Sequence, residues 1–235
     1  MALYGIIILL VGISLLGTVG ALAAWLHRRF GLPHALLTVG ILTFIGALMV
    51  RALALALIDR ALLGILPIGA LAFGVLAGFV DETARLFGFQ FLARSTVTRP
   101  QALMIGLGHG SVGAIYTGVL AIGLGTSLLG AGAERPDDLG ALLSGALAEA
   151  LNGTLPLVMH MALSWIVLQV FLRGQIGWLF GAIFLHAAAE IMAALLGPAD
   201  AWQVAAWRGL VALVSLLIIL RLGPPAPDEP IPDSG

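Results

Sequence analysis

The sequence predicts an all-α protein, a polytopic transmembrane helix bundle of about seven spans. Hydrophobic residues make up 60% of its 235 residues and charged residues only 10%, whereas roughly a quarter of the residues of a soluble domain are charged. The mean hydropathy is +1.10. Because one membrane-spanning helix takes about 20 apolar residues, the length suits about seven helices with short connections. Any function must therefore be carried by the membrane body.

The first expected span covers residues 4–26. It has no basic residue before it and is followed by His27, Arg28 and Arg29, so we interpret it as a retained helix and not as a cleaved signal peptide. Charged, proline or glycine breaks then delimit the other spans. These are residues 33–58, 61–92, 100–129, 155–172, 176–196 and 202–222.

Two segments fall outside these spans. Residues 139–151 form an amphipathic stretch that is interfacial, re-entrant or an extension of the fifth helix. The last twelve residues are rich in proline and acids, so we expect a single transmembrane domain over residues 1–223 and a disordered cytoplasmic tail over 224–235.

Charge and cysteine content exclude several classes of function. The net charge is −1, there is no lysine, and no basic patch is present that would bind nucleic acid. The absence of cysteine excludes disulfides, thiolate catalysis and thiolate metal sites. Arginine is concentrated in the loops on one side, and the positive-inside rule places that side in the cytoplasm, with the amino terminus outside and the carboxyl terminus inside. Arg51 and Arg208, near the outer ends of their helices, are expected to snorkel to the surface.

Titratable residues also lie within the spans, where they are costly and usually face a bundle interior or a water-filled cavity. At a rise of about 1.5 Å per residue, they lie roughly 14 to 26 Å from the cytoplasmic arginines. Four separate helices therefore bring such groups to overlapping depths. The residues are Glu82, Arg85, His109, His160, His186 and Glu190.

Local spacing adds to this pattern. His186 and Glu190 are four residues apart and share a helix face. Asp81, Glu82 and Arg85 form an Asp-Glu-x-x-Arg group, and residues 106–110 read Gly-Leu-Gly-His-Gly, a run that lets a neighbouring helix or a substrate approach the imidazole. This combination suits water activation beside a peptide bond. The alternatives for single elements are a helix-bridging histidine, a structural Glu82–Arg85 ion pair and ordinary small-residue packing.

These residues resemble the YhfC family of intramembrane metalloproteases, which is related to the PrsW and CAAX-processing membrane proteases. The resemblance covers most of the chain from about the third helix onward. Residues 81–85 look like the Glu-Glu-x-x-Arg motif of the family, residues 106–110 like its Gly-x-Gly-His-Gly motif, residues 160–164 like its third motif and residues 186–190 like its closing His-x-x-x-Asp. In the family a glutamate usually follows the Gly-His-Gly run, whereas this chain has Gly113 there.

The resemblance implies an intramembrane peptidase of the bacterial cytoplasmic membrane that cleaves a membrane-associated peptide or protein, with lipid around it. Glu82 would be the base that activates water, Arg85 its partner, and Glu190 would support His186. His109, His160 and His186 would bind the attacking water or a divalent metal such as zinc. The alternatives are a small transporter or proton-coupled carrier, and a catalytically inactive relative that acts as a binding scaffold. The sequence leaves the oligomeric state open.

Overall fold

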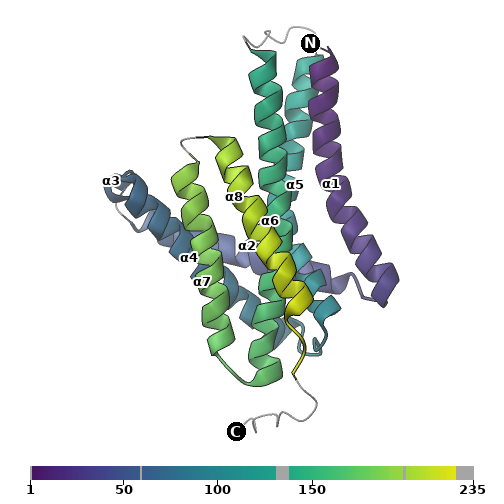
Figure 1. Cartoon of the computed structure of the whole chain (residues 1–235), viewed down its shortest axis with the longest axis vertical. Coiled ribbons are helices and arrows are strands. Elements are labelled where there is room, and N and C mark those ends of the chain that lie inside the picture. The colour runs from purple at the N-terminus through teal and green to yellow at the C-terminus, as the bar shows by residue number, and fades with distance from the viewer. Residues whose placement is uncertain (1, 59, 131–137, 198–199, 226–235) are drawn as a thin grey trace.

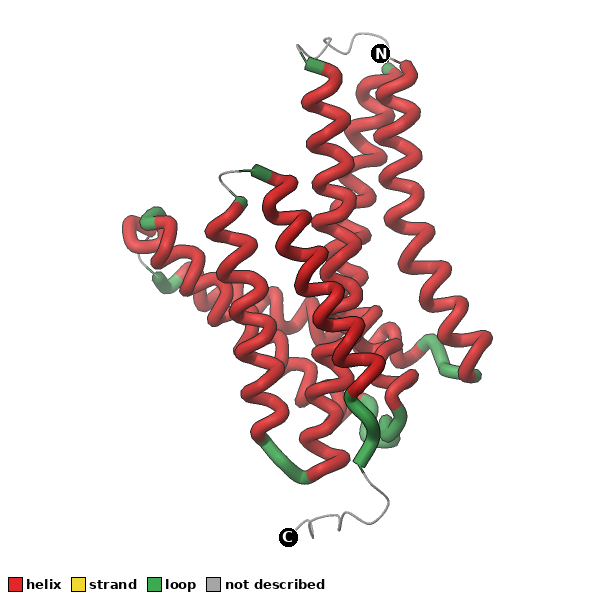
Figure 2. The backbone as a smooth tube through the Cα atoms, viewed as in Figure 1, coloured by secondary structure: helices red, strands yellow, loops and turns green. Residues whose placement is uncertain are grey.

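The computed structural model describes residues 2–58, 60–130, 138–197 and 200–225, and within these ranges the chain is helical with no strand (Figures 1 and 2). Seven helices are long and apolar enough to cross a membrane, which confirms the predicted all-α polytopic bundle. The helices are α1 (Ala2–Phe30), α2 (Ala35–Ala56), α3 (Arg60–Leu63), α4 (Leu66–Phe87), continued by the π-helix η1 (Gly88–Leu92), α5 (Arg99–Leu129), α6 (Leu139–Arg173), α7 (Gly177–Leu196) and α8 (Ala201–Arg221).

The third expected span, residues 61–92, is interrupted near its start. The short helix α3 ends at Leu63, and α4 begins at Leu66 with Pro67 in its first turn. Proline fits the first turn of a helix but not its interior, because it has no backbone N–H and its ring clashes with the preceding turn. The membrane-crossing part of this span therefore begins at Leu66 and runs through η1 to Leu92.

The amphipathic stretch 139–151 is an extension of the fifth predicted helix, because α6 is continuous over 35 residues. Pro156 lies inside it without ending it, and Gly174 closes it with a left-handed backbone at φ 64°. At about 1.5 Å per residue, α6 is roughly 52 Å long, well beyond a hydrocarbon core of about 30 Å. In Figure 1, α1, α5 and α6 rise together past the upper ends of α7 and α8.

Helix α5 is a central element of the packing, in contact with α1, α2 and α6, while α4 packs on α7 and α6 on α8. The Gly-rich run of α5, residues 106–110, allows the backbones of two neighbouring helices to come close. A Cβ atom on Gly108 would lie 2.1 Å from the carbonyl oxygen of Leu37 on α2, and one on Gly106 would lie 2.5 Å from the carbonyl oxygen of His160 on α6. The run therefore brings three helix backbones together around His109.

We expect Gly108→Ala to destabilise the protein by about 1–3 kcal/mol, the usual cost of overpacking a close contact. The added methyl would meet the backbone of α2, which cannot move aside as a side chain would. The measurement is the unfolding transition of the purified protein in detergent. Gly113→Ala is the matched control, because a Cβ on Gly113 in the same helix would meet nothing within 4 Å. Equal stability of the two variants would contradict the close-packing explanation.

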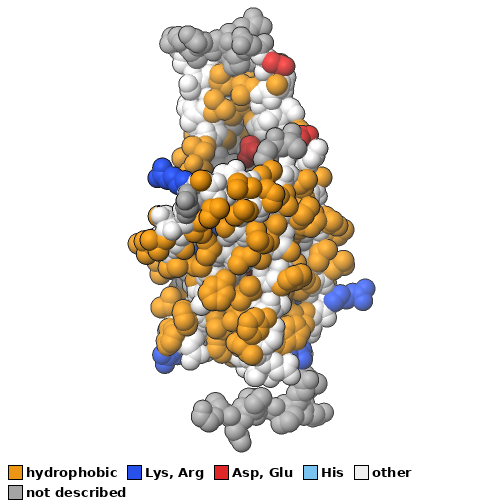
Figure 3. Space-filling model, turned by 90° about the vertical axis from the view of Figure 1, so that its left-hand side faces the viewer, with side chains coloured by type: hydrophobic (Ala, Val, Ile, Leu, Met, Phe, Trp, Pro, Cys, Tyr) orange, Lys and Arg blue, Asp and Glu red, His pale blue; other side chains and the backbone are white. Residues whose placement is uncertain are grey.

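The outer surface of the bundle is apolar. Large hydrophobic side chains such as Leu53, Phe184 and Leu220 are more than 60% exposed, and Figure 3 shows hydrophobic side chains over much of one side of the molecule. The buried polar residues, in contrast, gather in the interior. The protein is therefore an integral multi-pass membrane protein with a polar centre.

Candidate active site in the bundle interior

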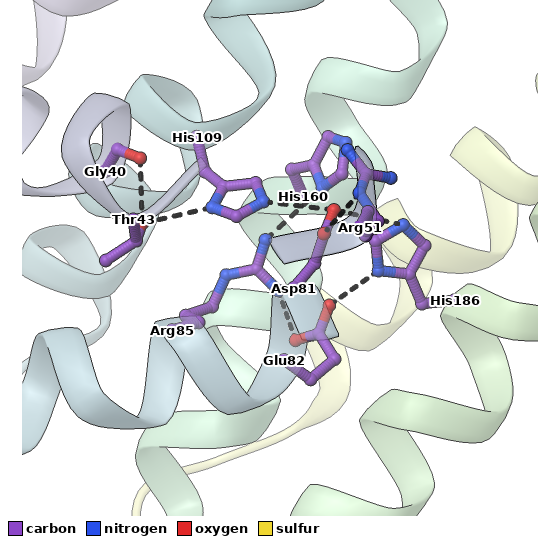
Figure 4. A network of polar contacts seen from close by, with 9 residues as sticks. All are labelled: Gly40, Thr43, Arg51, Asp81, Glu82, Arg85, His109, His160 and His186. Carbon is purple, nitrogen blue, oxygen red and sulfur yellow. Dashed lines mark hydrogen bonds and ion pairs between the residues drawn. The ribbon is translucent and has the colours of Figure 1, made fainter. Parts of the chain in front are cut away.

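Four helices bring titratable side chains to one place in the interior (Figure 4). Each of these side chains is buried, with at most 7% of its surface exposed. We call this set the polar cluster. It consists of Asp81, Glu82 and Arg85 from α4, His109 from α5, His160 from α6 and His186 from α7. The structure thus brings together five residues that sequence analysis singled out by depth, and it adds Asp81 at their centre.

Asp81 faces two imidazoles and one guanidinium. Its Oδ2 atom lies 3.5 Å from Nε2 of His109 and 3.9 Å from Nε2 of His186. Its Oδ1 atom lies 3.2 Å from Nε of Arg51, which comes from α2. The carboxylate of Asp81 therefore joins α2, α4, α5 and α7 at one point.

Glu82 has both of its oxygens engaged. His186 donates a hydrogen bond of 2.7 Å from Nδ1 to Oε1, and Arg85 donates from Nη1 to Oε2. Arg85 also lies 3.3 Å from Nδ1 of His160 through Nη2. Glu82 and Arg85 are completely buried. Through these contacts, Glu82 positions the ring of His186 and Arg85 positions the ring of His160.

The hydrogen-bond partners assign the tautomers of His109 and His186. Thr43 donates its hydroxyl hydrogen to the carbonyl oxygen of Gly40 at 2.8 Å, so at its 3.1 Å contact with Nδ1 of His109 it must accept. The carboxylate of Glu82 likewise accepts from Nδ1 of His186. A neutral imidazole carries one N–H, so Nε2 of each neutral ring is an acceptor that faces Asp81. The 3.5 Å contact between Nε2 of His109 and Oδ2 of Asp81 is then a hydrogen bond only when that ring carries a second hydrogen.

His160 has the opposite tautomer. Arginine has no acceptor, so Arg85 donates to Nδ1 of His160 and the hydrogen of the neutral ring lies on Nε2. The ring centroid of His160 is 5.1 Å from that of His109 and 5.2 Å from that of His186. The polar cluster therefore combines two imidazole acceptors and one imidazole donor.

Two acceptor nitrogens that face a carboxylate oxygen repel one another unless a hydrogen or a positive charge lies between them. The space beside Asp81 is thus suited to a water molecule that donates to these atoms, to a shared proton or to a cation. Among the described residues, however, no three His, Asp or Glu side chains are arranged as a group that could hold a metal ion.

A cavity of about 240 Å³ adjoins the polar cluster. Asp81, His160 and His186 line it directly, whereas Glu82 and Arg85 lie behind its wall. The cavity also reaches Glu190 on α7 and Gly113 on α5. Because a Cβ on Gly113 would meet nothing within 4 Å, the position at which the family usually has an acid lies open at the cavity.

Glu190 shares this cavity with His186, but no hydrogen bond joins the two within the described part of the chain. Its support of His186 stays a prediction. Glu149, two residues before the end of the amphipathic stretch, lies in a different cavity together with Ile8 and Leu124. It is therefore not part of the polar cluster.

Arg51 and Arg208 do not snorkel to the surface as expected. Arg51 turns inward to Asp81, and Arg208 donates a hydrogen bond from Nη1 to the backbone oxygen of Asn152. Both line the cavity. The reason is that an interior carboxylate and a free carbonyl offer these side chains stronger partners than the bilayer edge does. The sequence signal for Arg51 was its position inside an apolar run, five residues before the end of α2.

One family model, described as YhfC intramembrane metalloprotease, matches residues 8–131. The match begins in α1, earlier than the third helix where the resemblance was expected to start, and includes the motifs at residues 81–85 and 106–110. His160 and His186 lie beyond it. No significant match was found among curated proteins or among solved structures.

Proposed function

The chain belongs to the YhfC intramembrane metalloprotease family, and from this membership we propose that it is an intramembrane peptidase that hydrolyses a peptide bond of a membrane-associated substrate at the polar cluster. One observation carries the proposal. A carboxylate oxygen and two imidazole acceptors converge beside a cavity whose wall also holds the His160 ring, which is an N–H donor. Water activation and oxyanion stabilisation need this combination of acceptors and a donor.

In the proposed reaction, Asp81 accepts a proton from a water molecule as the water oxygen attacks the carbonyl carbon of the peptide bond. The carbonyl oxygen becomes negative and accepts a hydrogen bond from Nε2–H of His160. The C–N bond then breaks, and Asp81 returns the proton to the leaving amine. Glu82 holds His186 through Nδ1 and Arg85 holds His160, so this pair orients both rings without touching the substrate.

This assignment gives Glu82 a different role from the base that the family motif implies. Its oxygens are occupied by His186 and Arg85, and it lies outside the cavity lining. Asp81 is the neighbouring carboxylate that reaches the cavity. We therefore propose Asp81 as the base and Glu82 as the residue that orients His186.

The family name implies a metal, and the donors beside Asp81 are of the chemical types that zinc binds. Nε2 of His109 and Nε2 of His186 face the carboxylate of Asp81. The other nitrogen of each ring, Nδ1, is held by Thr43 in His109 and by Glu82 in His186, as is common for metal-binding histidines. Asp81, His109 and His186 would hold a divalent ion once their side chains moved closer together, since among the described residues no three such side chains form a metal-binding group as they stand. The ion would supply a Lewis acid for water activation and oxyanion stabilisation. His160 was also expected to bind the metal. It is better suited to donate a hydrogen bond from Nε2, because its Nδ1 already accepts from Arg85.

We expect the purified protein to retain zinc after dialysis and His109→Ala to lose it, because the variant removes an imidazole donor. Elemental analysis of the protein in detergent measures the bound zinc. His34→Ala is the matched control, since His34 stacks on His27 outside the polar cluster. Equal zinc contents in the two variants would exclude His109 as a ligand.

An apolar peptide segment is the substrate that the surroundings favour. A second cavity, of about 460 Å³, lies between α1, α5 and α6 and shares Tyr116 and Thr117 with the cavity of the polar cluster. Its wall includes Ile8, Leu15 and Leu120. An apolar segment in this second cavity would therefore lie next to the reacting groups.

The decisive experiment reconstitutes the protein in liposomes with hydrophobic peptides and follows cleavage by mass spectrometry. We expect wild-type protein to cleave and the variants Glu82→Gln and His109→Ala to have lost cleavage. Undiminished cleavage by both variants would remove the proposal. Proton or solute flux without cleavage would favour the carrier, and binding of a membrane protein with neither would favour the inactive scaffold.

For the orientation we expect Ser95→Cys to react with a membrane-impermeant maleimide only after the inner membrane is opened, because the positive-inside rule places the loop between η1 and α5 in the cytoplasm. Ser127→Cys, near the far end of α5, should react in intact spheroplasts. Both serines are exposed, and the natural chain has no cysteine that would add background. The reverse labelling pattern would invert the topology.

A further inference from the structure

The cavity has a second polar wall that the proposed reaction does not use. Arg208 from α8 and Asn152 from α6 line it together with Asp81 and His186. Arg208 donates from Nη1 to the backbone oxygen of Asn152, and the side chain of Asn152 donates from Nδ2 to the carbonyl oxygen of Ala201 at 3.3 Å. These bonds hold both side chains in place at the cavity.

Both side chains keep hydrogen-bonding atoms without a partner. Among the described residues, Nε of Arg208 and Oδ1 of Asn152 have no hydrogen-bond partner. Both atoms are buried, and Asn152 is only 6% exposed. In the described part of the chain, no carboxylate lies within ion-pair distance of Arg208. An unpaired guanidinium and an unpaired amide oxygen are both costly in a membrane interior. A ligand that accepts from one and donates to the other would remove the cost.

The charges at the cavity indicate what kind of ligand this is. Arg51 and Arg208 supply two positive charges, and Asp81 and Glu190 supply two negative charges, so the lining is formally neutral when the imidazoles are neutral. No net charge attracts an anion or a cation. A neutral group with one acceptor and one donor fits better, and a backbone peptide unit is such a group.

We propose that Arg208, Asn152 and Glu190 form a subsite that binds a backbone peptide unit of the substrate next to the bond that is cleaved. Arg208 donates to the substrate carbonyl, and Asn152 Oδ1 or the Glu190 carboxylate accepts from the substrate N–H. The inference rests on the proposed peptidase function and deepens it by identifying how the substrate is recognised.

The subsite also defines the conformation of the substrate. In a transmembrane helix each peptide group is satisfied within the helix, and an unwound segment in lipid would leave these groups unpaired. A donor and acceptors beside the polar cluster replace the bonds that the substrate loses on unwinding. The protein therefore binds an unwound, extended stretch and rejects the same sequence as an intact helix.

The test compares Arg208→Gln with wild type in the reconstituted cleavage assay. We expect the KM of the variant to rise about 10- to 100-fold, as for loss of a hydrogen bond to a charged group, with kcat within about threefold. Arg221→Gln, at the end of the same helix, is the matched control and should leave KM unchanged. An unchanged KM in Arg208→Gln, with cleavage intact, overturns the subsite and leaves the peptidase function standing.

A change in the substrate, with Arg208 left in place, covers the case in which Arg208→Gln does not fold. An ester in place of the amide next to the cleaved bond removes the N–H and weakens the carbonyl acceptor, so we expect weaker binding of about tenfold or more. Binding is measured with the Asp81→Asn variant, which holds the peptide without cleaving it. Equal binding of ester and amide, or a requirement for a free carboxylate in the peptide, overturns the inference. If the wild-type protein cleaves no peptide at all, that result contradicts the proposed peptidase function itself and, with it, the subsite.

Discussion

Asp81→Asn is expected to lower kcat by about 10²- to 10⁴-fold, the usual contribution of a positioned general base. Asparagine has nearly the same shape, but its amide cannot take the proton that the attacking water gives up. KM should change little, because the proposed peptide-binding groups on α6, α7 and α8 are untouched. Steady-state cleavage of a hydrophobic peptide by the reconstituted protein measures both quantities.

The unfolding transition must be measured alongside, because Asp81 is also the partner of Arg51 at 3.2 Å. Arg51 is 11% exposed and lines the cavity, so its charge is not fully enclosed when the ion pair is removed. Asp200→Asn is the matched control, since Asp200 is an exposed carboxylate at the start of α8, away from both cavities, and asparagine can keep its capping hydrogen bond. If Asp81→Asn folds and keeps kcat within threefold of wild type, Asp81 is not the base.

The second large effect is expected from the Glu82–Arg85 pair. Glu82→Gln should lower kcat by about 10²- to 10⁴-fold because the variant weakens the fixed orientation and tautomer of His186. It should also destabilise the protein by about 3–5 kcal/mol, because Arg85 would remain as an uncompensated buried charge. Both side chains are fully buried, so water cannot replace the lost partner.

The double variant Glu82→Gln/Arg85→Gln separates the two effects. Two neutral amides restore a hydrogen-bonded pair without an unpaired charge, so stability should recover relative to Glu82→Gln alone. Activity should not recover, since His160 and His186 have lost the groups that orient them. Recovery of activity with stability would show that the pair is only a structural ion pair, the simpler interpretation of the Glu82 and Arg85 spacing.

Much of the fold follows from local sequence. An apolar run bounded by arginines or prolines predicts a membrane helix whatever surrounds it in the fold. Within the bilayer, a single segment can satisfy its backbone hydrogen bonds only by forming a helix. The break before Leu66 and the continuity of α6 through Pro156 were harder to predict. A proline can end a helix or be tolerated within it, and the outcome depends on what packs around it.

The composition of the polar cluster was also accessible from sequence, because a charge or imidazole in a membrane span needs a protein partner. The shared depth of Glu82, His109 and His186 predicted that they meet. Depth along a helix does not specify direction around it. Asp81 and Glu82 are adjacent, about 100° apart on α4, and their separate partners on α2, α5 and α7 depend on how those helices are placed.

The sequence by itself therefore determined that this protein is a membrane helix bundle with titratable groups at a common depth, since hydropathy and residue spacing are local properties. Only the tertiary structure decided which atom faces which. The inward turn of Arg51 and Arg208, the opposite tautomers of His160 and His186, and the position of Asp81 at the cavity all arise from contacts between helices far apart in the chain. Hydrogen bonds are directional and short in range, so their pattern exists only once the helices have packed.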